Sequence, residues 1–241
     1  FVMPLPKIAT PTYELELPST GKTVQYRPFL VKEEKLLVIA LESEDTKQIT
    51  TAIKAVIKAC IKTRGVKVEA LPTFDIEYLF LNIRGKSVGE ELEVNVYCPD
   101  DDETQVAVNI NLDDIQVQKT EDHTNKIKID DSVMMEMRYP SLEQFIKNNF
   151  DFKEGNQMEQ SFDLIASCIG KIYTEDEVWS TADCSKKEVK EFLDSMNSNQ
   201  FKDIEKFFET MPKLSHKIKV TNPKTKVESE VVLEGLASFF A

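Results

Sequence analysis

The sequence predicts an α+β fold in which β-hairpins and a small β-rich middle section are combined with several amphipathic helices. Two patterns lead to this prediction. Apolar and polar residues alternate in short runs on either side of turn residues, and in other segments apolar residues recur at every third or fourth position. The composition, with 41% hydrophobic and 30% charged residues, is that of an ordinary globular protein and not of a disordered chain.

The first predicted element is a β-hairpin. Outward polar and inward apolar side chains alternate over Thr12–Leu17 and again over Thr23–Phe29, with a turn at Pro18–Lys22 between them. Gly21-Lys22-Thr23 matches the end of a phosphate-binding loop, but Glu16 stands where such a loop needs its first glycine. The segment is therefore predicted to be a turn and not a nucleotide site.

Two helices should follow this hairpin. A helical period runs from Leu30 to about Glu42, and Asp45 with Gln48 forms a capping box for a second helix that ends at Arg64-Gly65. The apolar stripe of the second helix comprises Ile49, Ala52, Ile53, Val56, Ile57, Cys60 and Ile61. We expect this stripe to pack against the first helix and the hairpin, with an open partner-binding groove as the alternative.

The next segments lead into the β-rich middle of the chain. A third helix is expected from Phe74 to about Arg84, with Gly85 stopping it. Alternation between Leu92 and Ile110 predicts a second hairpin, whose acidic tip lacks the spacing of an EF-hand loop and is interpreted as a solvated turn. Two short strands, over 126–129 and 133–138, are expected to extend its sheet.

Helices dominate the predicted C-terminal part. A capping box at Ser141 and Gln144 starts a helix to about Asn149, and an apolar seam predicts another helix over 158–173. Two further helices follow, one capped by Ser185 and Glu188, the other containing Phe201, Ile204, Phe207 and Phe208 and ended by Pro212. Trp179 is interpreted as a core anchor between them.

Three sections are expected along the chain. Residues 1–90 form the N-terminal hairpin with its helices, residues 91–140 form the β-rich middle section, and residues 141–241 form a helical section ending in a C-terminal β-hairpin.

The C-terminal hairpin resembles a shortened copy of the middle one. Val96-Tyr97-Cys98-Pro99 corresponds to Val220-Thr221-Asn222-Pro223, and Leu112-Asp113-Asp114-Ile115 corresponds to Leu233-Glu234-Gly235-Leu236. Both units are like zinc-ribbon knuckles in outline, but only Cys98 stands in a ligand-like position, and one thiolate cannot make a tetrahedral site. We interpret the copy as a hairpin repeated for structure, and leave open whether it is a degenerate zinc knuckle.

Charge and residue usage exclude several classes of function. A formal net charge of −12 argues against general nucleic-acid binding, and matches either a solubility requirement or a basic partner. The chain has no apolar run of a membrane helix's length and no signal-peptide pattern, so a soluble cytosolic protein is expected. Four scattered cysteines fit a reducing compartment, and the two histidines have no zinc-like spacing.

Catalytic motifs are missing from the sequence. It contains no G-x-S-x-G, H-E-x-x-H or G-x-G-x-x-G pattern, and its adjacent carboxylates point to opposite faces of a strand. We therefore expect a protein that is not an enzyme and has no cofactor or metal, while an enzyme or metal-dependent module with a dispersed site remains the weaker alternative.

The N-terminal region resembles a known family. The features that carry the resemblance are the Tyr13–Leu17 strand, the Pro18–Lys22 turn, Arg27-Pro28-Phe29 and Lys32-Glu33-Glu34, with Phe207-Phe208-Glu209 and Leu233-Glu234-Gly235-Leu236 near the C-terminus. They are similar to the T4-like bacteriophage baseplate hub assembly proteins. This resemblance implies a late, non-enzymatic viral assembly protein in the host cell cytoplasm, acting as a chaperone or scaffold for the hub of a contractile tail baseplate.

The resemblance also implies the kind of partner. Other hub proteins are expected, the long helical tape-measure protein among them, with a helix lodged in an apolar groove as the recognition mode. A permanent structural component of the virion tail baseplate is the alternative, and the oligomeric state is left open. The candidate partner contacts are Arg27, Pro28, Phe29, Leu236, Phe239 and Phe240, each of which could instead belong to an ordinary core.

Overall fold

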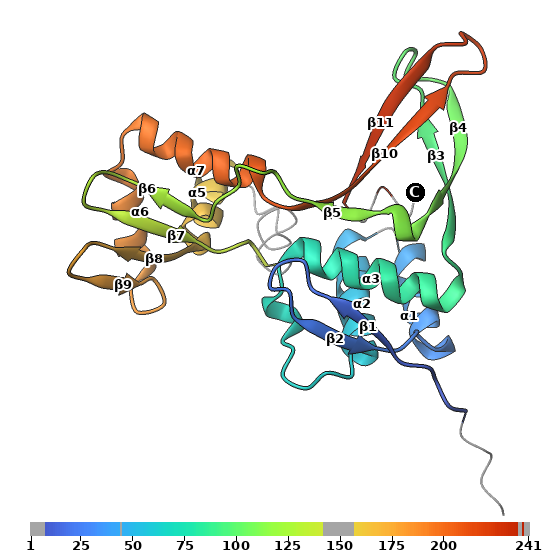
Figure 1. Cartoon of the computed structure of the whole chain (residues 1–241), viewed down its shortest axis with the longest axis horizontal. Helices are drawn as coiled ribbons and strands as arrows, with labels where there is room; N and C mark the ends of the chain where they lie inside the picture. The colour runs from blue at the N-terminus through green and yellow to red at the C-terminus, as the bar shows by residue number, and fades with distance from the viewer. Residues whose placement is uncertain (1–7, 44, 142–156, 236–237, 239–241) are drawn as a thin grey trace, which may run out of the picture. The chain divides into compact units, whose positions relative to one another are not determined.

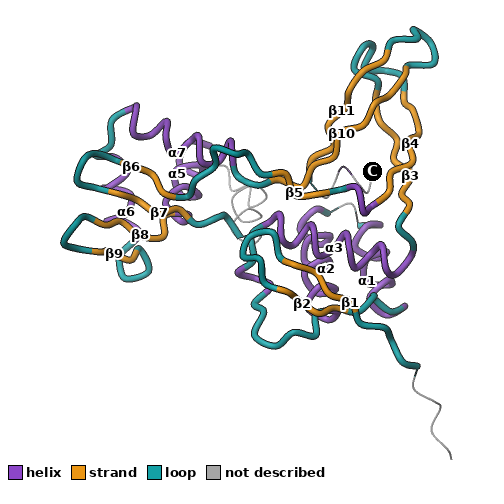
Figure 2. Tube along the Cα trace, in the orientation of Figure 1, coloured by secondary structure: helices purple, strands orange, loops and turns teal. Residues whose placement is uncertain are grey.

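The computed structural model describes residues 8–43, 45–141, 157–235 and 238. Helices are combined with small sheets, so the predicted α+β class is confirmed (Figure 2). The chain divides into two compact units. The first unit draws on residues 1–68, 74–116 and 214–241, and the second on residues 69–73 and 117–213.

The first unit contains a helical part and two long hairpins (Figure 1). Its main elements in chain order are β1 (Tyr13–Glu16), β2 (Thr23–Tyr26), α1 (Val31–Glu42), α2 (Thr46–Cys60), α3 (Thr73–Val88), β3 (Glu91–Tyr97), β4 (Gln105–Asn111), β10 (Lys213–Thr221) and β11 (Glu228–Glu234). Short 3-10 turns are formed by Val68–Ala70 and Leu112–Asp114. β3 pairs with β4, and a second sheet has the order β11–β10–β5, with β5 at Gln116–Gln118.

The N-terminal hairpin forms as predicted. β1 and β2 pair antiparallel, and the N–H of Gly21, at φ 67°, donates to the Leu17 carbonyl at 2.8 Å. The backbone N–H of Ser19 donates to the carboxylate of the fully buried Asp75 at 3.0 Å, and the Ser19 hydroxyl donates to the same group. The turn is therefore bound to the start of α3, which supports its interpretation as an architectural element.

The apolar stripe of α2 packs inward, as expected. Val56, Ile57 and Cys60 are completely buried. The cap differs from the predicted box. The Gln48 side-chain amide donates to the Asp45 carboxylate at 3.2 Å, and the Asp45 backbone N–H, which a capping box would pair with Gln48, donates to Ser43 Oγ instead. The helix also ends at Cys60, earlier than predicted, since the chain beyond it bonds to β2: the Lys62 N–H donates to the Gln25 carbonyl at 2.8 Å.

A buried ion pair joins the hairpin exit to α1. Arg27 Nη2 lies 3.0 Å from Glu33 Oε1, with side chains 12% and 6% exposed. Glu33 Oε2 also accepts the N–H of Leu30 at 2.7 Å, and the Arg27 N–H donates to the Cys60 carbonyl at 3.0 Å. Burial opposes ionisation of Glu33, but hydrogen bonds from Arg27 and Leu30 outweigh it and lower the pKa of Glu33. This one pair connects β2, α1 and the end of α2.

The third helix runs past the glycine predicted to stop it. Gly85 lies inside α3 and is buried, and a Cβ there would sit 3.4 Å from Cδ1 of Leu112. Gly89, at φ 122°, follows the helix and takes a conformation that other residues rarely adopt. Gly85 thus serves close packing, and Gly89 is the residue at the end of the helix.

Both long hairpins form where alternation predicted them. β3 and β4 pair with Val94 opposite Val108, and β10 and β11 pair with Ile218 opposite Val231. Their inward residues include Val94 and Ile218, which are buried.

The second unit is built on a four-stranded sheet of order β6–β7–β8–β9. Its elements are β6 (Lys126–Lys128), β7 (Met134–Met137), α5 (Gln157–Cys168), β8 (Ile169–Tyr173), β9 (Val178–Ser180), α6 (Lys186–Asp194) and α7 (Ser198–Thr210). The capping boxes of α6 at Ser185 and Glu188 and the predicted position of α7 are confirmed. The strands over 126–129 and 133–138 do not extend the β3–β4 sheet, because β7 pairs with β6 on one edge and β8 on the other.

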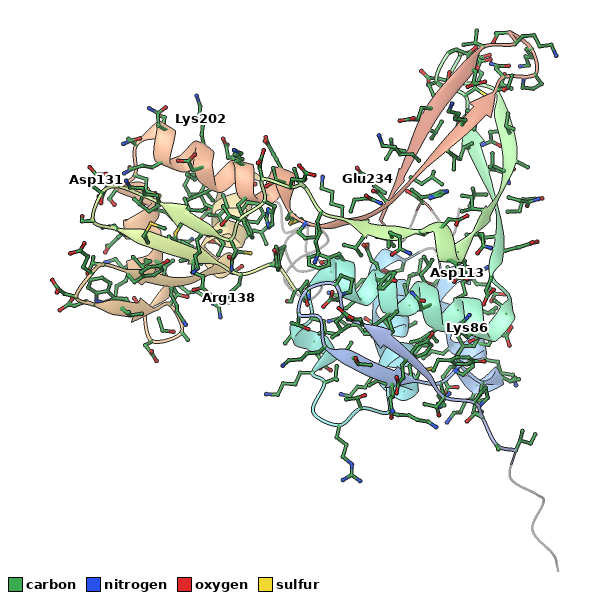
Figure 3. All side chains as sticks on the ribbon, in the orientation of Figure 1. Lys86, Asp113, Asp131, Arg138, Lys202 and Glu234 are labelled. Carbon is green, nitrogen blue, oxygen red and sulfur yellow. The ribbon has the colours of Figure 1, made fainter. Side chains whose placement is uncertain are left out.

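The predicted helix over 158–173 is wrong in its last turn. The helix ends at Cys168, and Ile169–Tyr173 form the strand β8 between β7 and β9. Arg138, which follows β7 and is labelled in Figure 3, donates from Nη2 to the Ile169 carbonyl at 3.1 Å. A Cβ on Gly170 would lie 3.0 Å from the Glu136 carbonyl oxygen, so the close approach of the strands depends on this glycine. Ile169 is buried on this strand, as it would have been on a helix, so its spacing in the sequence did not distinguish the two.

The core of the second unit joins its sheet to its helices. Its buried members are Ile127, Ile129, Met135, Met137, Ile165, Cys168, Ile169, Val189, Leu193, Ile204 and Phe207. Trp179, expected as a core anchor, lies on β9 and is 42% exposed, because it stands on an edge strand. Except for Ser141, the residues of the helix predicted over 141–149 lie outside those that the structure describes.

We expect the Glu33→Gln variant to destabilise the first unit by about 3 kcal/mol, because it leaves the Arg27 charge buried without its partner. Native-state hydrogen exchange of the Arg27 amide measures this change. Glu230→Gln is the matched control, since Glu230 pairs with Lys217 at 3.3 Å on the surface and should change stability by less than about 0.5 kcal/mol. Equal effects of the two variants would contradict the assigned role.

A second prediction concerns pH and His123 in the second unit. Its ring lies between Thr210 Oγ1 and Tyr139 Oη, each at 2.9 Å, and burial lowers its pKa. The unfolded chain therefore binds the proton more readily, so stability is full above the ordinary pKa of about 6.5 and declines as the pH falls through the folded pKa. Urea unfolding followed by Trp179 fluorescence between pH 7 and 5 should show this decline, and His123→Gln should flatten it.

Candidate protein-binding surface

Helix α1 exposes apolar side chains to an unusual degree. Six consecutive residues, Leu36–Leu41, are apolar, whereas the buried side of the helix uses Glu33 and Ala40. Val31 and Ile39 are 65% and 64% exposed. The exposed apolar residues of this helix and its N-cap are Leu30, Val31, Leu36, Val38, Ile39 and Leu41, which we call the α1 surface.

A groove of about 320 Å³ runs along this surface between α1 and α2. Its α1 wall is formed by Leu36, Ile39 and Ala40. The α2 wall is made of small side chains at its middle and of polar ones at its N-terminal end, namely Thr51, Ala52, Ala55, Asp45, Lys47 and Gln48. The small residues leave room above α2 for an apolar side chain from outside, while the polar end can meet backbone or charged groups.

The exposed apolar residues of the α1 surface are contiguous, and single exposed apolar residues scattered over a protein need no such explanation. A helix that is apolar on several sides is normally buried, because each exposed side chain leaves apolar area in contact with water. Contiguous exposed apolar residues with a charged rim mark interaction sites. Lys32, Glu34, Lys35 and Glu42 are exposed and provide that rim.

None of the residues proposed from the sequence as partner contacts is among the exposed residues of the α1 surface. Arg27 is held by Glu33 and by the Pro28 carbonyl, which its Nη1 contacts at 2.8 Å. Pro28 and Phe29 are partly buried, and the Phe29 N–H donates to Ser87 Oγ at 2.9 Å. The other three proposed contacts, Leu236, Phe239 and Phe240, lie outside the described residues. A role of these six residues in partner binding stays a prediction.

Sequence reasoning did not single out the α1 surface. The available signal was the unbroken run Leu36–Leu41, because an amphipathic helix of a globular protein interrupts such a run with polar residues. The stripe on α2, with the more regular spacing, consists of residues that pack inside the unit.

Chemistry-bearing groups are dispersed in the part of the chain that the structure describes. No three His, Cys, Asp or Glu side chains among these residues are placed to share a metal ion. Burial raises the pKa of the Cys60 and Cys168 thiols to about 11, so both are protonated at neutral pH and poor nucleophiles. None of the described helices has the length and hydropathy needed to cross a bilayer.

Comparison with known proteins decides the family. Residues 10–241 match the family described as T4 bacteriophage base plate protein. The chain belongs to this baseplate family. No curated protein and no solved structure matches it.

Membership of the baseplate family gives the protein a structural or assembly role in a bacteriophage and makes other baseplate proteins its expected binding partners. A family that works by protein association gives a physical reason for an uncovered apolar helix. The α1 surface is accordingly the best-supported candidate site for such an association.

We expect replacement of the α1 surface to lower the apolar area open to dyes. The Leu36→Gln/Ile39→Gln variant should bind less of the dye ANS than the unaltered protein, with the fold unchanged, because both side chains are exposed. Val178→Gln/Trp179→Gln, on exposed positions of β9, is the matched control. If the control lowers dye binding as much as the α1 variant, the α1 surface has no special apolar character.

Proposed function

We propose that this baseplate protein is a non-enzymatic assembly protein that acts as a chaperone or scaffold for the hub of a contractile tail. It binds other hub components through the α1 surface. Family membership supports the role in the baseplate, and the exposed apolar residues of α1 support binding as the way it acts.

A helical segment of the partner fits the groove best. Leu36 and Ile39 line the groove from α1, and the small residues Ala52 and Ala55 line it from α2. Together they form a shallow apolar channel between the two helices. An amphipathic helix can lay its apolar face in such a channel. The tape-measure protein, as a long helical hub component, is the partner we propose for this position.

Charge should influence which helix binds. The chain carries a net charge of −12, and the groove has Asp45 at its polar end. The N–H groups of Lys47 and Gln48 already donate to that carboxylate, so it is fixed in place as the cap of α2. A basic partner helix would therefore be drawn to the protein faster than an acidic one.

Two of the candidate contacts from the sequence adjoin the α1 surface. Pro28 and Phe29 lead directly into Leu30, the first residue of the α1 surface. We propose that they border the bound partner together with Arg27, and that Leu236, Phe239 and Phe240 also contact a partner.

A permanent baseplate component is the second candidate function, favoured by the family description itself. It uses the same surface, but the contact lasts in the finished tail. Mass spectrometry of purified tails distinguishes the two: the protein is retained if it is a component and absent if it is a transient chaperone.

We expect the protein to form a complex with hub or tape-measure proteins when they are co-expressed and analysed by size-exclusion chromatography. Leu36→Glu/Ile39→Glu should weaken that complex by on the order of 100-fold, since a charge in the centre of an apolar interface must be desolvated. Val178→Glu/Trp179→Glu controls for added charge at exposed positions of the second unit.

The opposite result would support a different class of protein. If the protein elutes alone with every hub protein, while metal analysis or a substrate screen is positive, the assembly function is wrong. If it forms the complex and the α1 variant binds as well as the control, the function stands and the α1 surface is the wrong interface.

A further inference from the structure

The turns of the β3–β4 and β10–β11 hairpins share one backbone geometry. In the first, the N–H of Asp102 donates to the carbonyl of Cys98 at 2.9 Å; in the second, the N–H of Lys226 donates to the carbonyl of Asn222 at 2.9 Å. In both turns the donor is the fourth residue after the acceptor. Asp102 and Lys226 also both have positive φ, at 53° and 65°. The two turns are therefore copies of one conformation, and not merely of one sequence pattern.

Side chains also play matching roles inside the two turns. Asp101 and Thr225 each stand three residues after the start of their turn, at Cys98 or Asn222. The side chain of each accepts the backbone N–H of the residue two positions later: Asp101 Oδ1 accepts from Glu103 at 3.1 Å, and Thr225 Oγ1 accepts from Val227 at 3.3 Å. Each turn begins with a buried residue followed by proline, Cys98 in one and Asn222 in the other.

The two turns lie close together at the ends of their hairpins (Figure 1). Polar side chains join them. Asn222 Nδ2 donates to Asp100 Oδ1 at 3.0 Å and to Asp101 Oδ2 at 3.0 Å. The hydroxyl of Thr225 donates to Asp100 Oδ2. We call Asp100, Asp101, Asn222 and Thr225 the turn clasp.

The orientation of the Asn222 amide is determined by its own turn. Its Oδ1 accepts the backbone N–H groups of Lys224 at 2.8 Å and Thr225 at 3.3 Å, so Nδ2 must face the opposite turn. An amide nitrogen repels a cation and satisfies a carboxylate. The centre of the clasp is thus organised for hydrogen bonding between the turns.

Four positions of the clasp region have the spacing of zinc-ribbon ligands. Such ribbons hold a metal with two C-x-x-C turns. Cys98 and Asp101 occupy the two ligand positions of the first turn, and Asn222 and Thr225 those of the second. The pKa of the Cys98 thiol is raised by burial and then by the negative charges of Asp100 and Asp101, so this thiol lies close to the clasp carboxylates.

We propose that the two turns form a knuckle pair in which hydrogen bonds of the turn clasp take the place of a structural metal ion. The backbone of a metal knuckle is kept. At the ligand positions, the side chains of Asp101 and Asn222 bind each other, and Thr225 binds Asp100, the neighbour of Asp101. The Asp100 carboxylate accepts from the amide of Asn222 and the hydroxyl of Thr225, and these hydrogen bonds hold the two turns together without a metal ion.

The clasp connects distant parts of the chain. Asn222 and Asp101 are 121 residues apart, and residues 117–213 of the second unit lie between them in sequence. Closing a loop of this length costs conformational entropy, so contacts at its ends are needed to keep the C-terminal hairpin on the first unit. The turn clasp, with the buried faces of both hairpins, supplies such contacts.

The hydrogen bonds are tested by Asn222→Leu and Thr225→Val, which keep the approximate shape and remove the donors. Hydrogen exchange of the Cys98 and Asn222 amides, which donate to Thr104 and Val227 across their turns, should accelerate by on the order of 10- to 100-fold for Asn222→Leu, and less for Thr225→Val. The control is Thr221→Val, at an exposed strand position beside the clasp. Adding EDTA to the unaltered protein should leave the exchange unchanged.

The knuckle geometry is tested by restoring the ligands. Asp101→Cys/Asn222→Cys/Thr225→Cys, with the native Cys98, should bind one equivalent of Zn²⁺ or Co²⁺, show the absorption of tetrahedral cobalt thiolate, and regain slow exchange when loaded. The control places the cysteine one residue away, as Asp100→Cys/Asn222→Cys/Thr225→Cys, and should bind the metal far more weakly.

Three results would overturn the proposal. The first is exchange in Asn222→Leu that matches the Thr221→Val control, and the second is faster exchange of the unaltered protein in EDTA. The third is a four-cysteine variant that binds zinc no better than its misplaced control, or that fails to fold when refolded with zinc, because either outcome means that the turns lack knuckle geometry.

Discussion

The buried Arg27–Glu33 ion pair is the contact on which the helical part of the first unit depends. It holds the end of β2 against the first turn of α1, and the Arg27 backbone binds the Cys60 carbonyl at the end of α2. Three elements are thereby fixed at one point. Because a charge pair of this burial is stable only when both partners and their hydrogen bonds are present, small displacements of α1 are costly.

This constraint accounts for the exposure of α1. With Glu33 held inward, the same side of the helix turns Ala40 toward α2, and the remaining apolar residues of the α1 surface must face outward. The helix is thus presented in a fixed orientation and not buried by collapse onto its neighbours. A preorganised apolar surface loses little entropy on binding, which is an advantage for a baseplate protein that must associate with others.

The C-terminal hairpin obeys a different constraint. The first unit is completed by residues that follow the whole second unit in the chain, so its last hairpin has to be recruited over a long loop. Buried Asn222 provides specificity there, because its amide oxygen is occupied by its own turn and its amide nitrogen donates to the carboxylates of the other turn. Ion pair and clasp both use polar groups to define how apolar elements meet.

Local chemistry predicted most elements of this protein, including the N-terminal hairpin, the stripe on α2 and the repeated turns at Cys98 and Asn222. Tertiary structure decided what the elements pack against. Ile169 ended in a strand because helical spacing reports burial but not its partner, and Gly85 stayed inside a helix because Leu112 packs on it. The α1 surface likewise followed from packing, since only the folded chain determines which apolar side chains are left in water.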